Sequence, residues 1–495
     1  MRILLLILLF SPSLLSAATF TVSSTADTSN PGSLRWAIEQ HNSQGGDNRI
    51  EFDPALAGET IFLTSNLPLV VFNTLEVDGN AAPGLAIDAN TQGRIFILGS
   101  NSNGFTVQNL KLQNSDGLFG GGCIRATGGG NLEVRVINVV FERCEQESFA
   151  NPTNSFSALG GAILTELGAD GVLDIRGSQF ISNRVYGTED LLFGGAVYAD
   201  GGRVDLINNV FELNTSDNLD AAAHQGGAVY VRDADVGLIE NEFLFNQADE
   251  GEGGAVVLNL RPENVATINR NLFAGNRAGL GAALWTATQV QGSDWPFFGL
   301  ANNTFLANTS TRAPGGAIYF REAETVIRNN SFIDNVNLSS GAAHLAYNPS
   351  ETDFFSVWNN LFTTATSDAC STFNNNPPAT FSNAGYNLLP DMSCMINGFN
   401  DLVADAGRFF PLADYGGATR TVPPADGNLA IDNANPNPIN SANSALCRFT
   451  DARDIDRPGD GDGDGTAVCD MGAFEWKQEA PLFFDGFERV GLVIP

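Results

Sequence analysis

The chain has 495 residues, of which 43% are hydrophobic and 16% are charged, and it contains 53 glycines. This composition is typical of an ordered, β-rich protein and excludes a mainly disordered chain. The 56 acidic and 25 basic residues give a net charge of −31, which excludes nucleic acid and anionic membranes as partners and favours divalent cations.

The first 18 residues have the features of a secretory signal peptide. Arg2 is the basic start, residues 3–10 form an apolar segment, and Ser16-Ala17-Ala18 is a small-residue cleavage site. The apolar segment is far shorter than the roughly 20 residues of a membrane span. We therefore expect a monomer that is exported to the outside of the cell or to its outer surface, without a transmembrane span.

Residues 19–115 are expected to form an N-terminal cap and the first coils of a larger β structure. Residues 20–22 read as a strand, and Ser33 is placed to cap a short helix over 34–41. Leu34 and Ile38 would lie on the buried side of that helix. A cap is needed because the open end of a β-solenoid exposes unpaired strand edges.

A repeat occupies residues 116–365. Its first element is a Gly-Gly-Ala box that opens an apolar strand, beginning at Gly160, Gly194, Gly226, Gly253 and Gly315. Its second element is a Phe-x-x-Asn box, and the six phenylalanines are 27 to 32 residues apart: Phe180/Asn183, Phe211/Asn214, Phe243/Asn246, Phe273/Asn276, Phe305/Asn308 and Phe332/Asn335. Such a period indicates a solenoid, a propeller or an array.

The repeat unit favours a parallel β-helix among these architectures. It contains short β-branched and aromatic runs broken by Gly, Asn and Asp, without helical periodicity. About 30 residues suit a coil of three short strands and three turns, whereas a propeller blade needs about 40–45. We predict an all-β, right-handed parallel β-helix with an N-terminal cap and an irregular C-terminal cap.

Each repeated residue has a physical role in this fold. The phenylalanines would point inward and stack from coil to coil. The asparagines would sit at corners, because Asn tolerates the left-handed backbone region, and their amides would bond to one another as a ladder. A second ladder is suggested by the asparagine pairs Asn208-Asn209, Asn302-Asn303, Asn329-Asn330 and Asn359-Asn360. Gly-Gly would supply a bend that a Cβ makes costly.

Six cysteines are an even number in a chain expected to meet an oxidising compartment. Neighbours in sequence suggest three pairs, one of several possible connectivities. We expect disulfides Cys370–Cys394 and Cys447–Cys469. The pair Cys123–Cys144 stays open, because these residues could lie on different sheets of one coil. The alternative is a pair of buried thiols.

Two surface features could bind a ligand. The loop around 460–465 has carboxylates at alternate positions followed by glycine, as in half of an EF-hand loop, and it predicts a structural Ca²⁺ site made by Asp460, Asp462, Asp464 and Asp470. The alternative is a solvated acidic loop. The second feature is a row of side chains that point outward from the Gly-Gly-Ala strands: Tyr198, Asp200, Tyr230, Arg232, Tyr319 and Arg321. These side chains could stack on sugar rings and bond their hydroxyls, or they could only stiffen the sheet.

The repeat boxes resemble those of the polymorphic outer-membrane protein repeats. The flanks resemble bacterial secreted β-helix proteins: residues 32–38 (GSLRWAI) are similar to the CSLREAI signature, with Gly32 and Trp36 in place of its Cys and Glu. Residues 412–419 (LADYGGAT) and 469–475 (CDMGAFE) resemble a choice-of-anchor Q region. The resemblance implies a pectin-lyase-like solenoid with such a region over 366–476 and a short tail over 477–495.

The functional expectation is a secreted or surface-attached, adhesin-like scaffold that binds glycan or surface partners. The alternative is a polysaccharide-active lyase or glycoside hydrolase, which rests on analogy of fold. We assign no catalytic residues, because no pair of carboxylates stands out and no Ser-His-Asp, Cys-His or metal-protease motif is present.

Overall fold

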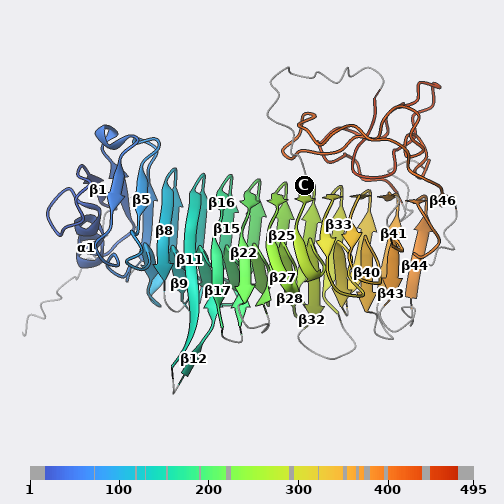
Figure 1. Cartoon of the computed structure of the whole chain (residues 1–495). Coiled ribbons are helices and arrows are strands. Elements are labelled where there is room, and N and C mark those ends of the chain that lie inside the picture. Colours follow the sequence, from blue (N-terminus) through green and yellow to red (C-terminus); the bar gives the residue numbers. More distant parts are fainter. Residues whose placement is uncertain are drawn as a thin grey trace, which may run out of the picture.

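The computed structural model describes residues 17–477 except for short gaps at 72, 118–119, 129, 152–153, 189–190, 219–223, 289–294, 322, 349–353, 364–366, 373–379, 395–399 and 438–445. Most of the predicted signal peptide and all but the first residue of the predicted tail therefore lie outside the described residues. The protein is nearly all-β, with 46% strand and 4% helix, and it winds into a parallel β-solenoid of about 11 turns (Figure 1). The predicted fold class is confirmed.

Sheet A is the longest face of the solenoid, and all of its neighbouring strands pair in parallel. Its thirteen strands are β1 (Thr19–Val22), β2 (Asn48–Phe52), β4 (Asn73–Asp78), β7 (Ser102–Gln108), β10 (Glu133–Ile137), β15 (Val172–Arg176), β20 (Arg203–Ile207), β25 (Asp235–Ile239), β29 (Val265–Asn269), β33 (Phe297–Ala301), β37 (Glu324–Arg328), β41 (Phe354–Trp358) and β44 (Thr380–Gly385).

Sheet C contains the strands that follow the Gly-Gly-Ala boxes. Its ten strands are β6 (Phe96–Leu98), β9 (Ile124–Thr127), β14 (Ile163–Glu166), β19 (Val197–Asp200), β24 (Val229–Arg232), β28 (Val256–Leu260), β32 (Leu284–Thr288), β36 (Ile318–Arg321), β40 (Leu345–Asn348) and β43 (Cys370–Thr372).

Sheet B closes the coil and contains the Phe-x-x-Asn boxes. Its first column is β3 (Thr60–Phe62), β5 (Ala86–Asp88), β8 (Lys111–Gly117), β11 (Val140–Asn151), β16 (Gln179–Ile181), β21 (Val210–Glu212), β26 (Glu242–Leu244), β30 (Leu272–Ala274), β34 (Thr304–Leu306), β38 (Ser331–Ile333), β42 (Leu361–Phe362), β45 (Leu388–Leu389) and β46 (Leu402–Val403). Beside it lie β13 (Ala158–Leu159), β17 (Arg184–Gly187), β18 (Leu192–Phe193), β22 (Thr215–Asn218), β23 (His224–Gln225), β27 (Gln247–Glu252), β31 (Arg277–Leu280), β35 (Thr309–Ser310) and β39 (Val336–Asn337), and β12 (Asn154–Phe156) forms an antiparallel hairpin with the end of β11.

The N-terminal cap forms as predicted. Helix α1 (Leu34–Gln44) covers the first coil and is capped by Ser33, whose hydroxyl accepts a hydrogen bond from the Trp36 N–H at 3.2 Å. Leu34 and Ile38 are buried beneath it, and Trp36 makes an edge contact with Phe20 of β1. A 3-10 turn, η1 (Pro54–Leu56), follows β2.

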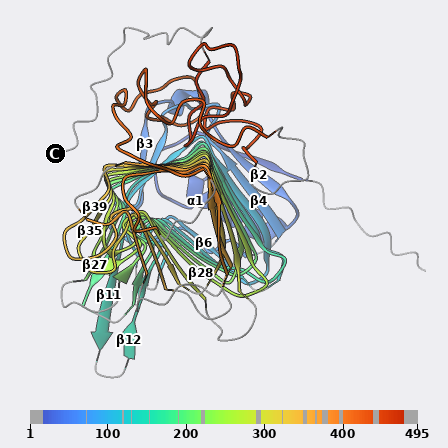
Figure 2. The same cartoon turned by 90° about the vertical axis from the view of Figure 1, so that its right-hand side faces the viewer.

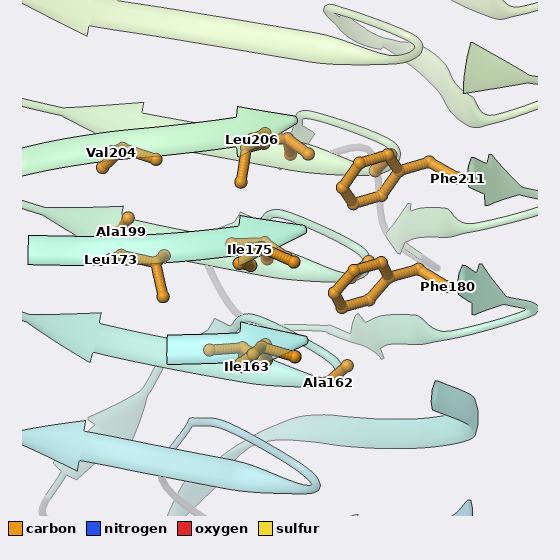
Figure 3. Close-up of a cluster of buried hydrophobic side chains, with 14 of the residues drawn as sticks. Ala162, Ile163, Leu173, Ile175, Phe180, Ala199, Val204, Leu206 and Phe211 are labelled. Carbon is orange, nitrogen blue, oxygen red and sulfur yellow. The ribbon is translucent and has the colours of Figure 1, made fainter. Parts of the chain in front are cut away.

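The predicted phenylalanine column runs through the core. Eight rings stack nearly parallel, with centroids 4.6 to 4.9 Å apart and interplanar angles of 2 to 8°: Phe141, Phe180, Phe211, Phe243, Phe273, Phe305, Phe332 and Phe362. Figure 3 shows Phe180 and Phe211 beside aliphatic side chains of sheets A and C. Stacking at the spacing of the coils locks each turn to the next.

Both predicted asparagine ladders are present. In each, the side-chain Nδ2 donates to the Oδ1 one coil further on, as from Asn214 to Asn246 at 2.9 Å and from Asn209 to Asn241 at 3.0 Å. The prediction that the Phe-x-x-Asn asparagine adopts the left-handed conformation is wrong, because the preceding residue does so, for example Leu213 at φ 57°. That bend leaves the asparagine amide pointing inward along the ladder.

In the boxes that begin at Gly160, Gly194, Gly226 and Gly253 the two glycines have different roles, whereas both Gly315 and Gly316 have positive φ. Gly194 requires the left-handed region, with φ 69°, as the first glycine of every complete box does. At the second glycine, Gly195, an added Cβ would lie 2.0 Å from the carbonyl oxygen of Gly227 in the next coil. The first glycine therefore makes the bend, and the second allows two backbones to approach closely.

All three cysteine pairs suggested by the sequence form disulfides, including Cys123–Cys144, which the sequence left open. Cys144 occupies the ladder position of its coil, where its backbone N–H donates to Asn183 Oδ1, and its Cα lies 5.6 Å from that of Cys123. The corner between sheets B and C brings these inward positions together within one coil. The other two bonds, Cys370–Cys394 and Cys447–Cys469, confirm the prediction.

The predicted C-terminal cap does not cover the end of the solenoid but lies along its side. From about residue 404 it folds back over the outer side of sheet B (Figures 1 and 2). Its Val422, Phe409 and Leu412 pack on a row of apolar side chains that point outward from the sheet: Leu244, Leu272, Ala274, Leu306 and Ile333.

A second contact aligns this region with the coils. Segment 448–454 runs along the left-handed residues at the corner of sheets A and B. Asn329 Oδ1 accepts from the Arg448 N–H at 3.2 Å, Asn302 Nδ2 donates to the Thr450 carbonyl at 2.9 Å, and Arg270 pairs with Asp454. In three of the predicted pairs the first asparagine, Asn302, Asn329 or Asn359, thus binds the C-terminal region, while the second asparagine builds the ladder.

Candidate functional site

The predicted outward row on sheet C has the predicted register. Tyr198 pairs with Tyr230, and the row continues through Val257, Trp285 and Tyr319. Sequence reasoning missed Trp285, although its coil carries a variant box, Gly281-Ala282-Ala283, that could have placed it.

The aromatic faces of this row are covered. Tyr198, Tyr230, Trp285 and Tyr319 are 3 to 5% exposed, because they point away from the central core but pack under side chains of sheet B. Phe193 of β18 stacks on Tyr230 with centroids 4.5 Å apart. The prediction of an exposed stacking surface is therefore corrected: in this structure the row is a small second core. Burial raises the pKa of both Tyr198 and Tyr230.

The polar ends of the same row reach the surface. Arg232 forms an ion pair with Asp200 of the neighbouring coil, and this hydrogen bond raises the pKa of Arg232. Asn259 Nδ2 donates to the Tyr230 hydroxyl at 3.1 Å, and Arg321 is exposed. A ligand on sheet C would thus meet a guanidinium, a carboxylate and an amide at the rim rather than ring faces.

The acidic C-terminal loop converges on a residue from outside the loop. Carboxylate oxygens of Asp432, Asp460 and Asp462 all lie within 4.8 Å of one another. Oxygens bound to one Ca²⁺ at 2.3–2.6 Å can be up to about 5 Å apart, so the spacing fits this cation. Asp432 Oδ1 is buried and has no hydrogen-bond partner among the described residues, which is the position a cation would satisfy. Burial first, and also the charge of Asp462, raises the pKa of Asp432.

Backbone N–H groups hold the cluster in shape. Asp432 Oδ2 accepts from the Gly461 and Asp462 N–H groups at 2.8 and 2.6 Å. Asp460 accepts from the N–H groups of Gly463 and Gly465 at 2.7 and 3.1 Å. The loop therefore presents its carboxylates from a preformed turn.

The other two predicted metal ligands lie elsewhere. Asp464 is exposed and accepts from the Thr466 N–H at 2.7 Å. Asp470 is buried, and its two oxygens accept from the N–H groups of Asp432 and Trp476 at 2.8 and 2.6 Å. Asp470 thus positions the backbone of Asp432 instead of joining the cluster. Burial, and then the charge of Glu475, raises the pKa of Asp470.

The fold and these sites define the protein as a parallel β-solenoid with a laterally docked C-terminal region. No model of a known protein family matches the chain, and a search of curated proteins finds no significant match. Among the described residues, no helix is both long and apolar enough to cross a membrane. Three disulfides are compatible with an extracellular protein.

Proposed function

We propose that this chain is an exported, non-enzymatic scaffold that binds glycan or surface partners through rows of side chains along its coils, as an adhesin does. The observation that carries the proposal is the continuous locking of the coils by one phenylalanine column and two asparagine ladders. Outer side chains on such a rod are held at a fixed repeat of about 4.8 Å. Preorganised rows suit repetitive ligands, because little conformational entropy is lost on binding.

The proposed calcium ion has a structural role. Bound between Asp432, Asp460 and Asp462, it would tie the acidic loop to the segment that carries Ala430 and Ala434, which are buried in the C-terminal core. This core also contains the Cys447–Cys469 disulfide. Calcium would thereby hold the region against the side of the solenoid. The affinity needed is low, since sites in extracellular modules bind with Kd of about 10⁻⁴–10⁻³ M.

Two measurements test the proposal. Purified protein is applied to a glycan array, and every glycan that it binds is then incubated with it and assayed for new reducing ends and unsaturated sugars. We expect binding without products; product formation would favour the polysaccharide-active enzyme. A thermal melt with and without EDTA tests the ion, and an unchanged midpoint would remove calcium from the proposal.

A further inference from the structure

Arg176 and Arg328 occupy the same rung position on the outer face of sheet A. The register runs from Arg176 through Ile207, Ile239, Asn269 and Ala301 to Arg328. Arg176 has an ion pair with Asp174, two residues earlier, at 2.7 Å. The position equivalent to Asp174 in the coil of Arg328 is occupied by Val326, so no carboxylate stands two residues before Arg328.

A second arginine is placed beside Arg328. Arg448 comes from the docked C-terminal segment, and its backbone N–H donates to the side chain of Asn329. Arg328 lies over the ring of Trp358 at 5.9 Å, and the Trp358 indole N–H donates to the Leu446 carbonyl at 3.1 Å. Two distant parts of the chain thus each place an arginine next to Asn329, at the corner of sheets A and B.

The charges at this place are not neutralised by described residues. Neither Arg328 nor Arg448 forms an ion pair with a carboxylate in the described part of the chain, although the protein has a net charge of −31. Burial and the charge of Arg448 lower the pKa of Arg328 to about 10, whereas Asp174 raises the pKa of Arg176. Like charges held together are unfavourable, and an anion between them would reverse that cost.

The sheet beside Arg328 differs from the rest of its face. In the N-terminal coils the outer positions carry paired charges, such as Arg203 with Asp205. From β29 to β37 the central positions are Thr267, Gly299 and Val326, which carry no charge, and the equivalent Ser356 of β41 is buried. The edge opposite Arg328 carries exposed apolar side chains, with Val265 at 45%, Phe297 at 37% and Phe354 at 37% exposure.

We propose that this part of the outer face of sheet A, from β29 to β37 with the exposed Phe354 edge of β41, binds an acidic polysaccharide. Its sulfate or carboxylate groups would pair with Arg328 and Arg448, and its sugar rings would lie on Phe297 and Phe354. The two edges are about 13 Å apart along the strands, so one sugar ring cannot reach both and the ligand must be an oligomer. This inference rests on the proposed glycan binding and names its ligand class and place.

The carboxylate of Glu324 would repel the charged groups of a bound polyanion and so fix how the ligand is oriented on this surface. Glu324 lies between Phe297 and Phe354 in the register and is exposed. A polyanion would therefore keep its charged groups at the arginine edge, and only its ring faces would approach the phenylalanine edge.

The probes are a dextran sulfate oligosaccharide and uncharged dextran of the same length, measured by isothermal titration calorimetry with the full chain. We expect dextran sulfate to bind and dextran to bind much more weakly. Arg328→Gln and Arg448→Gln should each raise Kd about tenfold. Arg176→Gln, the matched change at the same rung, should leave Kd within about twofold, because that arginine is already paired. Glu324→Gln should tighten binding.

Three results would overturn the inference: equal binding of dextran, unchanged affinity of Arg328→Gln, or an equal loss in Arg176→Gln. Tight binding of poly-glutamate at the same site would reassign it to an acidic peptide. Thermal melts of each variant check folding. If the glycan array shows binding that Arg328→Gln does not disturb, the proposed function stands and only this site fails; if no glycan binds, both fail.

Discussion

The last acceptor of one asparagine ladder is a histidine. Asn335 Nδ2 lies 3.2 Å from His344 Nδ1, and His344 Nε2 lies 2.9 Å from the carbonyl oxygen of Thr363. A carbonyl only accepts, so Nε2 carries the proton and Nδ1 is the acceptor. The ladder therefore ends on a group that is complementary only while the imidazole is neutral.

This arrangement predicts a pH dependence of stability. Burial lowers the pKa of His344 from 6.5 to about 4. Below pH 6.5 the unfolded chain binds a proton that the folded chain does not, so the free energy of unfolding should fall between pH 6.5 and about 4, by up to about 3 kcal/mol. Above pH 6.5 His344 is neutral in both the folded and the unfolded chain, so this loss of stability is absent there.

Urea unfolding as a function of pH measures the effect. His344→Asn retains an acceptor oxygen for Asn335 and cannot become charged. The difference in slope between the wild type and this variant should correspond to about one proton in that window. Parallel pH profiles would show that His344 does not titrate between the folded and unfolded states as proposed.

Breaking a ladder in its middle should cost more than removing a surface residue. Asn246 accepts from Asn214 N and Nδ2 at 3.0 and 2.9 Å and donates to Phe211 O and Asn276 Oδ1 at 2.8 and 3.0 Å. Asn246→Ala leaves these buried groups without partners, and we expect a loss of about 3 kcal/mol or more. Urea unfolding measures this loss, and Thr267→Ala on the exposed face serves as the control. Equal unfolding midpoints for Asn246→Ala and Thr267→Ala would contradict the prediction.

The coil-to-coil structure could be predicted because each repeat carries the same chemistry at the same place. Phe-x-x-Asn and Gly-Gly-Ala align the coils without any knowledge of other parts of the chain. The side-on docking of the C-terminal region could not be read this way, since it depends on contacts between distant segments. The sequence does carry a signal of this docking, because residues next to the core phenylalanines change from polar to apolar along the chain. Gln179 and Glu212 flank the phenylalanines of earlier coils, whereas Leu272 and Ile333 flank those of the coils on which the region docks.

In the candidate sites, too, the features set by local sequence could be predicted and those set by contacts between distant segments could not. The local Asp-x-Asp spacing found Asp460 and Asp462, but Asp432 is 28 residues before Asp460 in sequence and joins them only through the fold. The register of the sheet C row was correct, yet its exposure was not, because the covering side chains belong to sheet B. Sequence periodicity specifies which side chains share a row, and tertiary packing decides whether that row is open.

Docking of the C-terminal region should depend on Arg420. Its guanidinium binds the Glu242 carboxylate of β26 through Nε at 3.0 Å and through a second nitrogen at 2.5 Å. Arg420→Ala leaves a largely buried carboxylate with only the residue 420 N–H as partner at this contact, so local opening should become about 1–3 kcal/mol easier. Limited proteolysis should cut region 404–476 faster, while Arg408→Ala, an exposed change in that region, should not alter the rate. Equal rates would show that Arg420 does not stabilise docking.

The calcium proposal predicts opposite effects of one substitution in two buffers. Asp432→Asn keeps an oxygen for the Gly461 and Asp462 N–H groups but removes one negative charge from the cluster. With calcium at about 5 mM and Kd of about 10⁻⁴–10⁻³ M, the wild type should gain about 1–2 kcal/mol, and the variant should gain little. In EDTA the variant should be at least as stable as the wild type, because it lacks the repulsion from Asp462 that raises the pKa of Asp432. Asp464→Asn, outside the cluster, should respond to calcium as the wild type does, and a calcium response retained in Asp432→Asn would place the ion elsewhere.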